Sequence, residues 1–263
     1  MTMYGSPAAW ARGPDLVYGA LARAAVARLP GPLAGRLAVD AGTGTGAVAR
    51  ALAARGARVV ALDSSAAMVG YASTRRAPGV VADIRAVPVR TSTVDIAVAG
   101  FVLSHLPDPV VGLVELARVT RAGGWVLATA FPTDRTGHPI KDAVDRVLDA
   151  FGYAAPDWYL ALKGEGEERV GTAAGLLDVG REAGLAGGTV AELTVGLDLT
   201  AGELARWRLG MGHVAPWLST VDPARRSAVV TAATTAVAAT ALAPLPMLVL
   251  LAHPTPASPV RPA

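Results

Sequence analysis

The sequence has no cysteine and little charge. None of its 263 residues is cysteine, and charged side chains make up only 17% of the chain. Disulfides, thiolate nucleophiles and sulfur-ligated metal sites are therefore excluded, and we expect a cytoplasmic protein. Charge is nearly balanced, with 24 basic and 21 acidic side chains, and no basic run is longer than an arginine pair. A nucleic-acid partner is therefore not expected.

One long stretch lacks charge altogether. No charged residue occurs over residues 228–252, a length that could cross a bilayer. Two prolines interrupt this stretch, however, and Asp222 before a proline is typical of a helix start. We therefore predict a helix from Asp222 and a buried strand over 245–252 rather than a membrane segment. The N-terminal residues also lack the apolar core of a signal peptide.

From residue 37 onward, short apolar runs alternate with helical patterns. This alternation is typical of an α/β protein in which helices wrap a parallel sheet, and the length fits one domain with insertions. The predicted strands are residues 37–40, 58–62, 79–82, 94–99, 125–131, 188–197 and 245–252. The predicted helices include residues 47–55, 108–120, 141–151, 172–182 and 201–209. A glycine pair at 123–124 is expected to separate a helix from the strand that follows it.

A glycine-rich turn, residues 42–46, follows the first predicted strand. Its spacing fits both a dinucleotide-binding loop and an S-adenosylmethionine-binding loop. Asp40 precedes the turn, where a carboxylate would repel a pyrophosphate but stabilise an ammonium or sulfonium group. Asp63 ends the second strand, where it suits a ribose diol, and Asp83 ends the third, where it could accept from an adenine amino group. Asp63 would suit the ribose of either ligand, whereas Asp40, Asp83 and the absence of lysine and arginine from the turn favour S-adenosylmethionine over a nicotinamide dinucleotide.

Five motifs occur in order along the chain. They are VDAGTGTG (39–46), VVALDSSAAMV (59–69), ADIRAVPV (82–89), VDIAVAGFVLSHLPDP (94–109) and RAGGWVLATAF (121–131). With them the sequence resembles the class I S-adenosylmethionine-dependent methyltransferases, in particular the small-molecule, ubiquinone- and menaquinone-biosynthesis-like (type 11) group. The resemblance implies a Rossmann-like, doubly wound sheet of seven strands in the order 3-2-1-4-5-7-6, with the last strand antiparallel. It also implies S-adenosylmethionine as the cofactor.

The resemblance further implies a set of cofactor-binding residues at the ends of the first four strands. In it, the glycine turn and the residues after the fourth strand surround the methionine part, while the acids after the second and third strands hold the ribose and the adenine. The residues implied are Asp40, Gly42, Thr43, Gly44, Asp63, Ser64, Met68, Asp83, Ile84, Ala99, Gly100 and Phe101.

We expect a single methyltransferase domain over residues 1–253 and a disordered tail over 254–263. Within the domain we expect four parts in chain order. They are a helical cover (1–35), a cofactor-binding core (36–132), a lid or substrate insertion with a helix (133–185), and the last two strands (186–253) with a helical insertion at 198–244.

No catalytic constellation stands out, and in-line methyl transfer needs little beyond alignment of the reacting atoms. A general base helps where the acceptor does not ionise by itself, and the candidates are His105, His138 and His213. A packed or solvated histidine is the more common reading of such positions. Several aromatic side chains outside the core motifs predict an apolar acceptor pocket, or else join the added helices to the sheet. They are Tyr4, Trp10, Tyr18, Trp158, Tyr159 and Trp217.

These features predict methylation of a small molecule on oxygen, nitrogen or carbon, for example a natural-product or quinone-like intermediate. An S-adenosylmethionine-binding protein that catalyses another reaction, such as a cyclisation, remains an alternative, and a nicotinamide-dependent oxidoreductase is a weaker one. Histidines and carboxylates show no metal-ligand spacing, so no metal is expected. The oligomeric state is left open between monomer and homodimer.

Overall fold

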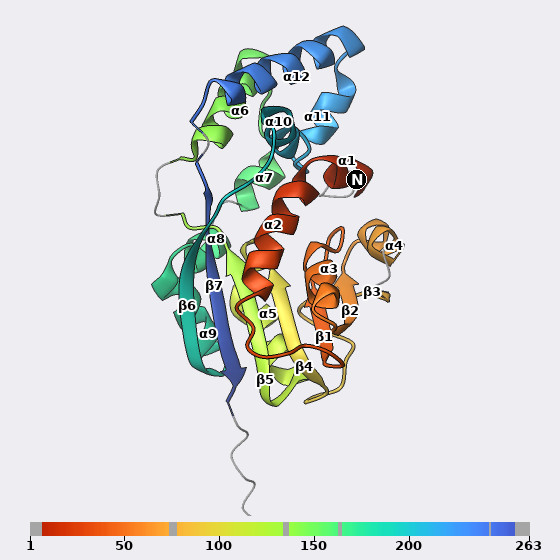
Figure 1. Cartoon of the computed structure of the whole chain (residues 1–263), viewed down its shortest axis with the longest axis vertical. Coiled ribbons are helices and arrows are strands. Elements are labelled where there is room, and N and C mark those ends of the chain that lie inside the picture. The colour runs from red at the N-terminus through yellow and green to blue at the C-terminus, as the bar shows by residue number, and fades with distance from the viewer. Residues whose placement is uncertain (1–6, 74–77, 134–136, 163–164, 242, 256–263) are drawn as a thin grey trace, which may run out of the picture.

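A computed structural model describes residues 7–73, 78–133, 137–162, 165–241 and 243–255, and they build a seven-stranded sheet in the order β3-β2-β1-β4-β5-β7-β6 (Figure 1). The strands are β1 (Leu37–Ala41), β2 (Arg58–Asp63), β3 (Gly79–Val81), β4 (Val94–Gly100), β5 (Thr120–Ala130), β6 (Leu185–Val195) and β7 (Leu245–Pro254). Pairs among β1 to β5 are parallel, and β7 runs antiparallel to both β5 and β6. The predicted α/β fold and strand order are confirmed.

One strand begins earlier than its sequence indicates. Strand β5 starts at Thr120, directly after helix α5 (Pro109–Val119), so the predicted break at Gly123 and Gly124 is wrong. The two glycines lie instead in an irregular part of the strand, where the register with β4 shifts. A Cβ at Gly124 would lie 2.8 Å from the Asp95 carbonyl oxygen, so glycine here permits a close strand approach.

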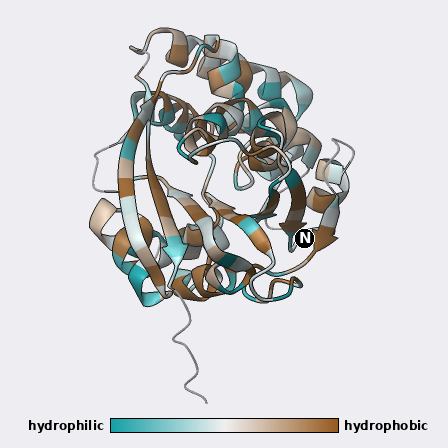
Figure 2. Cartoon of the chain, turned by 60° about the horizontal axis from the view of Figure 1, so that its bottom comes forward, coloured by the Kyte–Doolittle hydropathy of each residue, from teal (hydrophilic) through white to brown (hydrophobic). Residues whose placement is uncertain are grey.

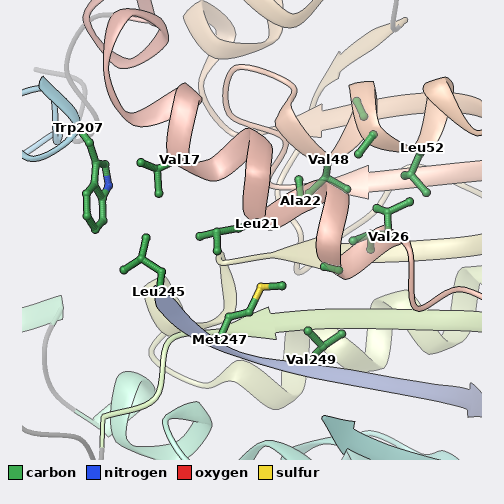
Figure 3. Close-up of a cluster of buried hydrophobic side chains, with 14 of the residues drawn as sticks. Val17, Leu21, Ala22, Val26, Val48, Leu52, Trp207, Leu245, Met247 and Val249 are labelled. Atoms are coloured by element: carbon green, nitrogen blue, oxygen red, sulfur yellow. The ribbon is translucent and has the colours of Figure 1, made fainter. Parts of the chain in front are cut away.

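Helices cover both faces of the sheet, as a doubly wound fold requires. They are α2 (Pro14–Val26), α3 (Ala47–Ala54), α4 (Ala66–Ser73), α5 and α9 (Ala173–Glu182). One core joins Val17 and Leu21 of α2 to Leu52 of α3 and Met247 of β7 (Figure 3). A second core on the opposite face joins α5 and α9 to the same sheet. Hydrophobic segments follow the inner strands, whereas the helices carry both hydrophilic and hydrophobic segments (Figure 2).

A further group of helices gathers beyond the carboxyl ends of the parallel strands (Figure 1). They are α1 (Pro7–Arg12), α6 (Pro139–Ala150), α7 (Asp157–Leu162), α8 (Glu165–Val170), α10 (Ala201–Leu209), α11 (Ala215–Thr220) and α12 (Pro223–Ala238), with a short 3-10 helix, η1 (Leu103–His105), after β4. The glycine- and glutamate-rich residues 165–168, a composition typical of an exposed turn, are helical in α8. Open α/β sheets place ligands at this edge, so these helices are positioned to shape a pocket.

The uncharged stretch over 228–252 forms the end of α12 and most of β7, as predicted. Helix α12 begins at the Asp222 cap, whose carboxylate accepts from the Arg225 amide, and buries Val229, Ala233 and Val237 four residues apart. Among the described residues, no helix has the length and apolarity needed to cross a membrane.

Candidate functional site

The glycine turn between β1 and α3 has backbone conformations that residues other than glycine rarely adopt. Gly42, Gly44 and Gly46 have φ angles of 77°, 54° and 87°. A Cβ at Gly42 would also lie 2.5 Å from the Val102 side chain, so glycine is needed there for both reasons. The amides of Gly42 and Thr43 donate to the Leu62 carbonyl oxygen, each at 2.8 Å, which fixes the turn against β2.

Asp40 holds this turn from the end of β1. One carboxylate oxygen accepts from the Thr43 hydroxyl at 2.6 Å and from the Ala49 amide at 2.9 Å. The other oxygen, Oδ1, is buried with no hydrogen-bond partner. Burial raises the pKa of Asp40 to about 6. An unpartnered buried acceptor beside the turn fits a cofactor that carries a cationic donor.

Asp63, at the end of β2, joins the turn to the start of α4. One of its oxygens accepts from the Gly44 amide and the other from the Ser65 amide, both at 2.9 Å. Each carboxylate oxygen can accept more than one hydrogen bond, so capacity remains for a ligand diol. The side chain lines a cavity in front of the turn.

That cavity has a volume of about 410 Å³ and lies along the carboxyl ends of β1, β2 and β4. Its walls include nearly all of the predicted cofactor residues. Those on the wall are Gly42, Thr43, Gly44, Asp63, Ser64, Met68, Asp83, Ile84, Gly100 and Phe101. Asp40 and Ala99 are buried and are not among the lining residues. Ala99 packs into the core on the α5 side of the sheet, because neighbouring residues of a strand face opposite ways.

At one end of this cavity, Asp83 is paired with a residue that sequence reasoning missed. The Arg85 side chain donates to both carboxylate oxygens of Asp83, and the closest contact is 2.6 Å. Hydrogen bonding from Arg85 holds the pKa of Asp83 below its usual value. An adenine amino group would therefore share this carboxylate with Arg85. The neighbouring Ile84 is buried and supplies an apolar wall.

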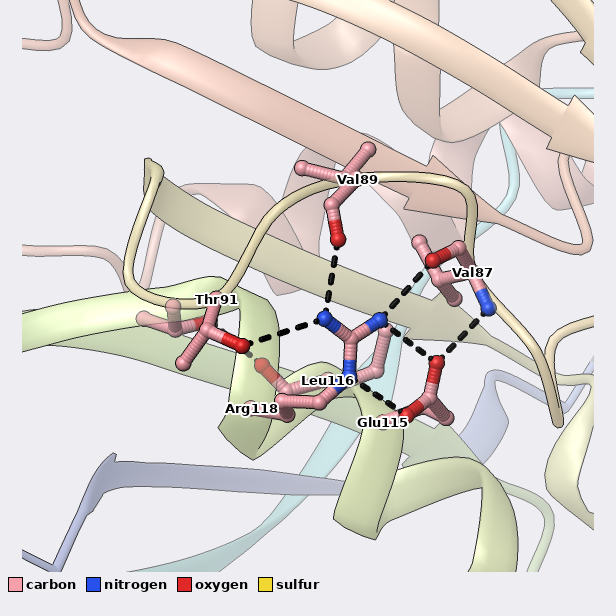
Figure 4. Close-up of polar contacts among 7 residues, drawn as sticks. Val87, Val89, Thr91, Glu115, Leu116 and Arg118 are labelled. Carbon is pink, nitrogen blue, oxygen red and sulfur yellow. Dashed lines mark hydrogen bonds and ion pairs between the residues drawn. The ribbon is translucent and has the colours of Figure 1, made fainter.

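The chain that follows Ile84 is fixed by an ion pair on α5 (Figure 4). Arg118 donates to Glu115 at 2.6 Å and to the carbonyl oxygens of Val87 and Val89 at 2.8 and 2.9 Å. Glu115 in turn accepts from the Val87 amide at 2.7 Å. Arg118 and Glu115 thus form hydrogen bonds with backbone groups that lie outside the strands, which keeps this end of the cavity in place.

The N-terminal helices cover the same cavity. Asp15, near the start of α2, accepts from the Thr45 hydroxyl and from Arg50, each at 2.7 Å. This buried network ties α2 to the glycine turn. As a result Trp10 of α1 and Tyr18 of α2 line the cavity.

A second cavity of about 410 Å³ opens among the added helices. It shares Trp10, Tyr18, Phe101 and His105 with the first cavity, so the two spaces meet at these residues. Its other lining residues include Phe131, Thr133, Lys141, Trp158, Tyr159, Glu167, Trp207, Arg208, Met211 and His213. These side chains come from the end of β5 and from the two predicted insertions.

Phe101 lines both cavities and has a strained backbone conformation. It follows β4 with a φ angle of 56°, which residues other than glycine rarely adopt. Its amide donates to the Thr129 hydroxyl at 3.0 Å. Its ring lies 4.6 Å from Phe131 and 5.3 Å from Tyr18, measured between centroids. Strain of this kind is common at functional sites, but sequence carries no signal for it.

Two of the three candidate histidines line a cavity. His105 lines both cavities, and His213 lines the second, stacked on Tyr159 at 3.7 Å between ring centroids. His138 is not among the residues lining either cavity. It precedes α6 with its ring buried near Trp207, and burial lowers its pKa. A catalytic role for any of the three stays a prediction.

The predicted aromatic acceptor residues divide in the same way. Trp10, Tyr18, Trp158 and Tyr159 line the second cavity. Trp217 does not line it and packs instead against Tyr153, with ring centroids 5.3 Å apart. Tyr4 lies outside the described residues.

Comparison with known proteins gives the class of this fold and site. Residues 39–128, which include the glycine turn, Asp63, Asp83 and Phe101, match the family described as a methyltransferase domain. The resemblance seen in the motifs is therefore confirmed: residues 39–128 are similar to a methyltransferase domain of the class I type, whose cofactor is S-adenosylmethionine.

Individual proteins are similar to this chain in sequence or in fold. The chain is 33% identical over 130 residues to a demethylmenaquinone methyltransferase of Mycolicibacterium gilvum, covering 47% of this chain and 57% of that protein. It thus spans little more than half of that relative. Among solved structures, it is similar to a putative methyltransferase from an antibiotic biosynthesis pathway of Anabaena variabilis, with a TM-score of 0.60, 15% identity and coverage of 91% and 98%. The (4+2)-cyclase SpnF is similar with a TM-score of 0.54, 18% identity and coverage of 92% and 81%.

Proposed function

We propose that this protein transfers a methyl group from S-adenosylmethionine to a small-molecule acceptor. The observation that carries the proposal is the meeting of two cavities at Trp10, Tyr18, Phe101 and His105. One cavity adjoins the glycine turn and Asp63, and the other lies among the variable helices. In-line transfer needs a donor and an acceptor that approach each other across such a junction.

The first cavity would hold the cofactor. Asp63 would accept from the ribose hydroxyls, while the glycine turn would lie along the methionine part beside the unpartnered oxygen of Asp40. Ile84 would pack against the adenine ring, with Asp83 and Arg85 at its edge. The cofactor supplies a methyl group that its sulfonium charge activates.

The chain's own groups would align the acceptor and exclude water. Trp10 and Tyr18 close the junction from above the sheet, held by the network that ties α2 to the glycine turn. His105 lies on the walls of both cavities and could take a proton from a hydroxyl or amine acceptor. The aromatic walls of the second cavity suit a ring-bearing, natural-product or quinone-like acceptor. We further propose a cytoplasmic role in small-molecule biosynthesis.

Calorimetry tests the cofactor assignment. S-Adenosylhomocysteine should bind and NADH should not. Asp63→Ala should weaken binding by on the order of 1 to 3 kcal/mol, because a buried hydrogen-bonded pair is lost. The control Asp178→Ala removes an exposed carboxylate on α9 and should leave binding unchanged. Binding of NADH in place of S-adenosylhomocysteine would overturn the assignment.

A transfer assay tests the activity. The protein is incubated with S-adenosylmethionine and an acceptor panel of phenols, quinols, amines and carboxylic acids, and release of S-adenosylhomocysteine is measured. We expect release with at least one acceptor class. A protein that binds the cofactor tightly and converts an acceptor without releasing S-adenosylhomocysteine would instead support the cyclisation alternative.

A further inference from the structure

The second cavity carries two cationic side chains from neighbouring helices, Lys141 of α6 and Arg208 of α10. The Lys141 ammonium lies 4.6 Å from the ring centroid of Phe131 and 5.8 Å from that of Trp207. Both rings line the cavity, so this cation is part of an aromatic wall. Glu167 is the one carboxylate among the lining residues that the structure describes.

Arg208 is buried, with 7% of the residue exposed. One terminal nitrogen donates to both carboxylate oxygens of Asp145 on α6, at 2.6 and 2.9 Å. Asp145 itself is 46% exposed and is not among the residues lining the cavity. This contact leaves Arg208 Nε buried with no hydrogen-bond partner. An unpaired buried donor of a charged group is costly, and Arg208 also lines the cavity, so its guanidinium is a candidate group for binding a ligand acceptor atom.

The indole nitrogen of Trp207 is also unpartnered, but it does not support the same inference. Figure 3 shows this nitrogen on the side of the ring that faces Val17, in the apolar core. We therefore count only Arg208 and Lys141 as groups that could recognise a ligand in the second cavity.

The charge of Arg208 acts close to the junction of the two cavities. Burial raises the pKa of Tyr18, and the Arg208 guanidinium opposes part of that effect. Burial also raises the pKa of Tyr153 to about 12, again opposed by Arg208. Tyr18 lines both cavities and Arg208 lines the second, so an acceptor group held by Arg208 would share its cavity with a residue of the junction.

We propose that the acceptor is an aromatic compound bearing an anionic oxygen group, a carboxylate or a phenolate, which Arg208 and Lys141 bind in the second cavity. This inference rests on the proposed function, because it takes that cavity as the acceptor site. The aromatic walls, including Trp158 and Tyr159, would hold the ring. A cationic acceptor would meet two positive side chains and one carboxylate, so it is disfavoured.

For a phenolate, recognition and activation coincide. Two cations beside the oxygen lower the pKa of a phenol, so the hydroxyl proton leaves to solvent before transfer. The phenolate oxygen would then attack the methyl carbon as the carbon–sulfur bond breaks, giving an aryl methyl ether and S-adenosylhomocysteine. No side chain would need to act as a base for such an acceptor.

Binding measurements on the full chain, saturated with S-adenosylhomocysteine, test the proposal. The carboxylate probe is 1-naphthoate, matched with neutral 1-naphthamide. The phenolate probe is 4-nitrophenol, matched with 4-nitroanisole. At least one anion should bind about tenfold more tightly than its neutral partner, which corresponds to the added strength of charge-assisted hydrogen bonds. Bound 4-nitrophenol should also show phenolate absorbance at a lower pH than the free compound.

Variants separate recognition from structural damage. Lys141→Met and Arg208→Met should remove most of the anion preference, whereas Arg146→Met on α6 and Arg206→Met on α10 change exposed arginines and should not. Asp145→Asn should strengthen anion binding, because it removes the counter-charge of Arg208. Damage to the fold could only weaken binding, so stronger anion binding by Asp145→Asn could not result from such damage.

The outcomes are distinct. Equal binding of anionic and neutral probes, absence of binding by both anions, or a preference that survives Lys141→Met and Arg208→Met would overturn the inference. Failure of the wild-type chain to bind S-adenosylhomocysteine would overturn the proposed function instead.

Discussion

Asp40→Asn measures what it costs to keep a carboxylate buried under the glycine turn. The folded-state pKa of Asp40 is raised from 3.8 to about 6. A raised carboxyl pKa adds stability that is fully present below pH 3.8 and is lost as the pH rises through 6. A shift of about two units corresponds to roughly 3 kcal/mol. The free energy of unfolding of the wild-type chain, relative to Asp40→Asn, should therefore fall by up to about 3 kcal/mol between pH 4 and pH 7.

Urea unfolding of both chains without ligand, across this pH range, gives that difference directly, because the other titrating groups are common to both.

The two chains are also compared in S-adenosylhomocysteine binding. If a ligand ammonium lies near the unpartnered oxygen of Asp40, wild-type affinity should rise about tenfold between pH 5 and pH 7, since the carboxylate ionises in that range. Affinity of Asp40→Asn should change little. Parallel stability profiles would refute the buried-charge argument, and a pH-independent wild-type affinity would refute the ammonium contact.

Three further predictions concern the frame of the site. Phe101→Ala should be less stable to urea than Phe101→Gly by about 1 kcal/mol, the reverse of the usual order, because only glycine relieves the positive φ; the usual order would contradict strain at this position. Arg118→Met should lower the free energy of unfolding by about 1 to 3 kcal/mol, because Glu115 and two carbonyl groups lose their donor. An unchanged free energy of unfolding would contradict the role of Arg118 in holding the backbone of Val87 and Val89. Asp15→Asn, which removes the charge that pairs with Arg50, should speed proteolytic cleavage within α2 and its flanks; unchanged cleavage would show that α2 is held by other contacts.

The sheet followed from sequence because each strand carries its own local signal. Apolar runs bounded by Gly42–Gly46, Asp63 and Asp83 indicated the strand ends, and the resemblance of the five motifs to a known family implied the topology. The start of β5 was missed because Gly123 and Gly124 usually end a helix, and only pairing with β4 shows that the strand continues through them. Helix α8 was missed because its residues read as a polar turn.

Most predicted cofactor residues lie on the first cavity because they follow strand ends in sequence. Asp40 and Ala99 are exceptions: both lie within two residues of a wall residue in sequence, yet the strand geometry buries them. Arg85 carried no motif signal, and its pairing with Asp83 depends on the conformation of the turn after β3. His105 lines both cavities and His138 lines neither, and this difference depends on tertiary packing that the sequence does not show.

The sequence alone determined the strand ends and the glycine turn, because these depend on residues that are close together along the chain, and its resemblance to a known family implied the strand order and the cofactor class. The tertiary structure decided the acceptor cavity, because its walls come from helices far apart in sequence. Lys141 and Arg208 are unremarkable in the sequence, although lysine is scarce there. Only the packing of α6 against α10 places their charges in one aromatic cavity beside the junction with the cofactor site. The low overall charge of the chain makes that pair of cations informative about the ligand.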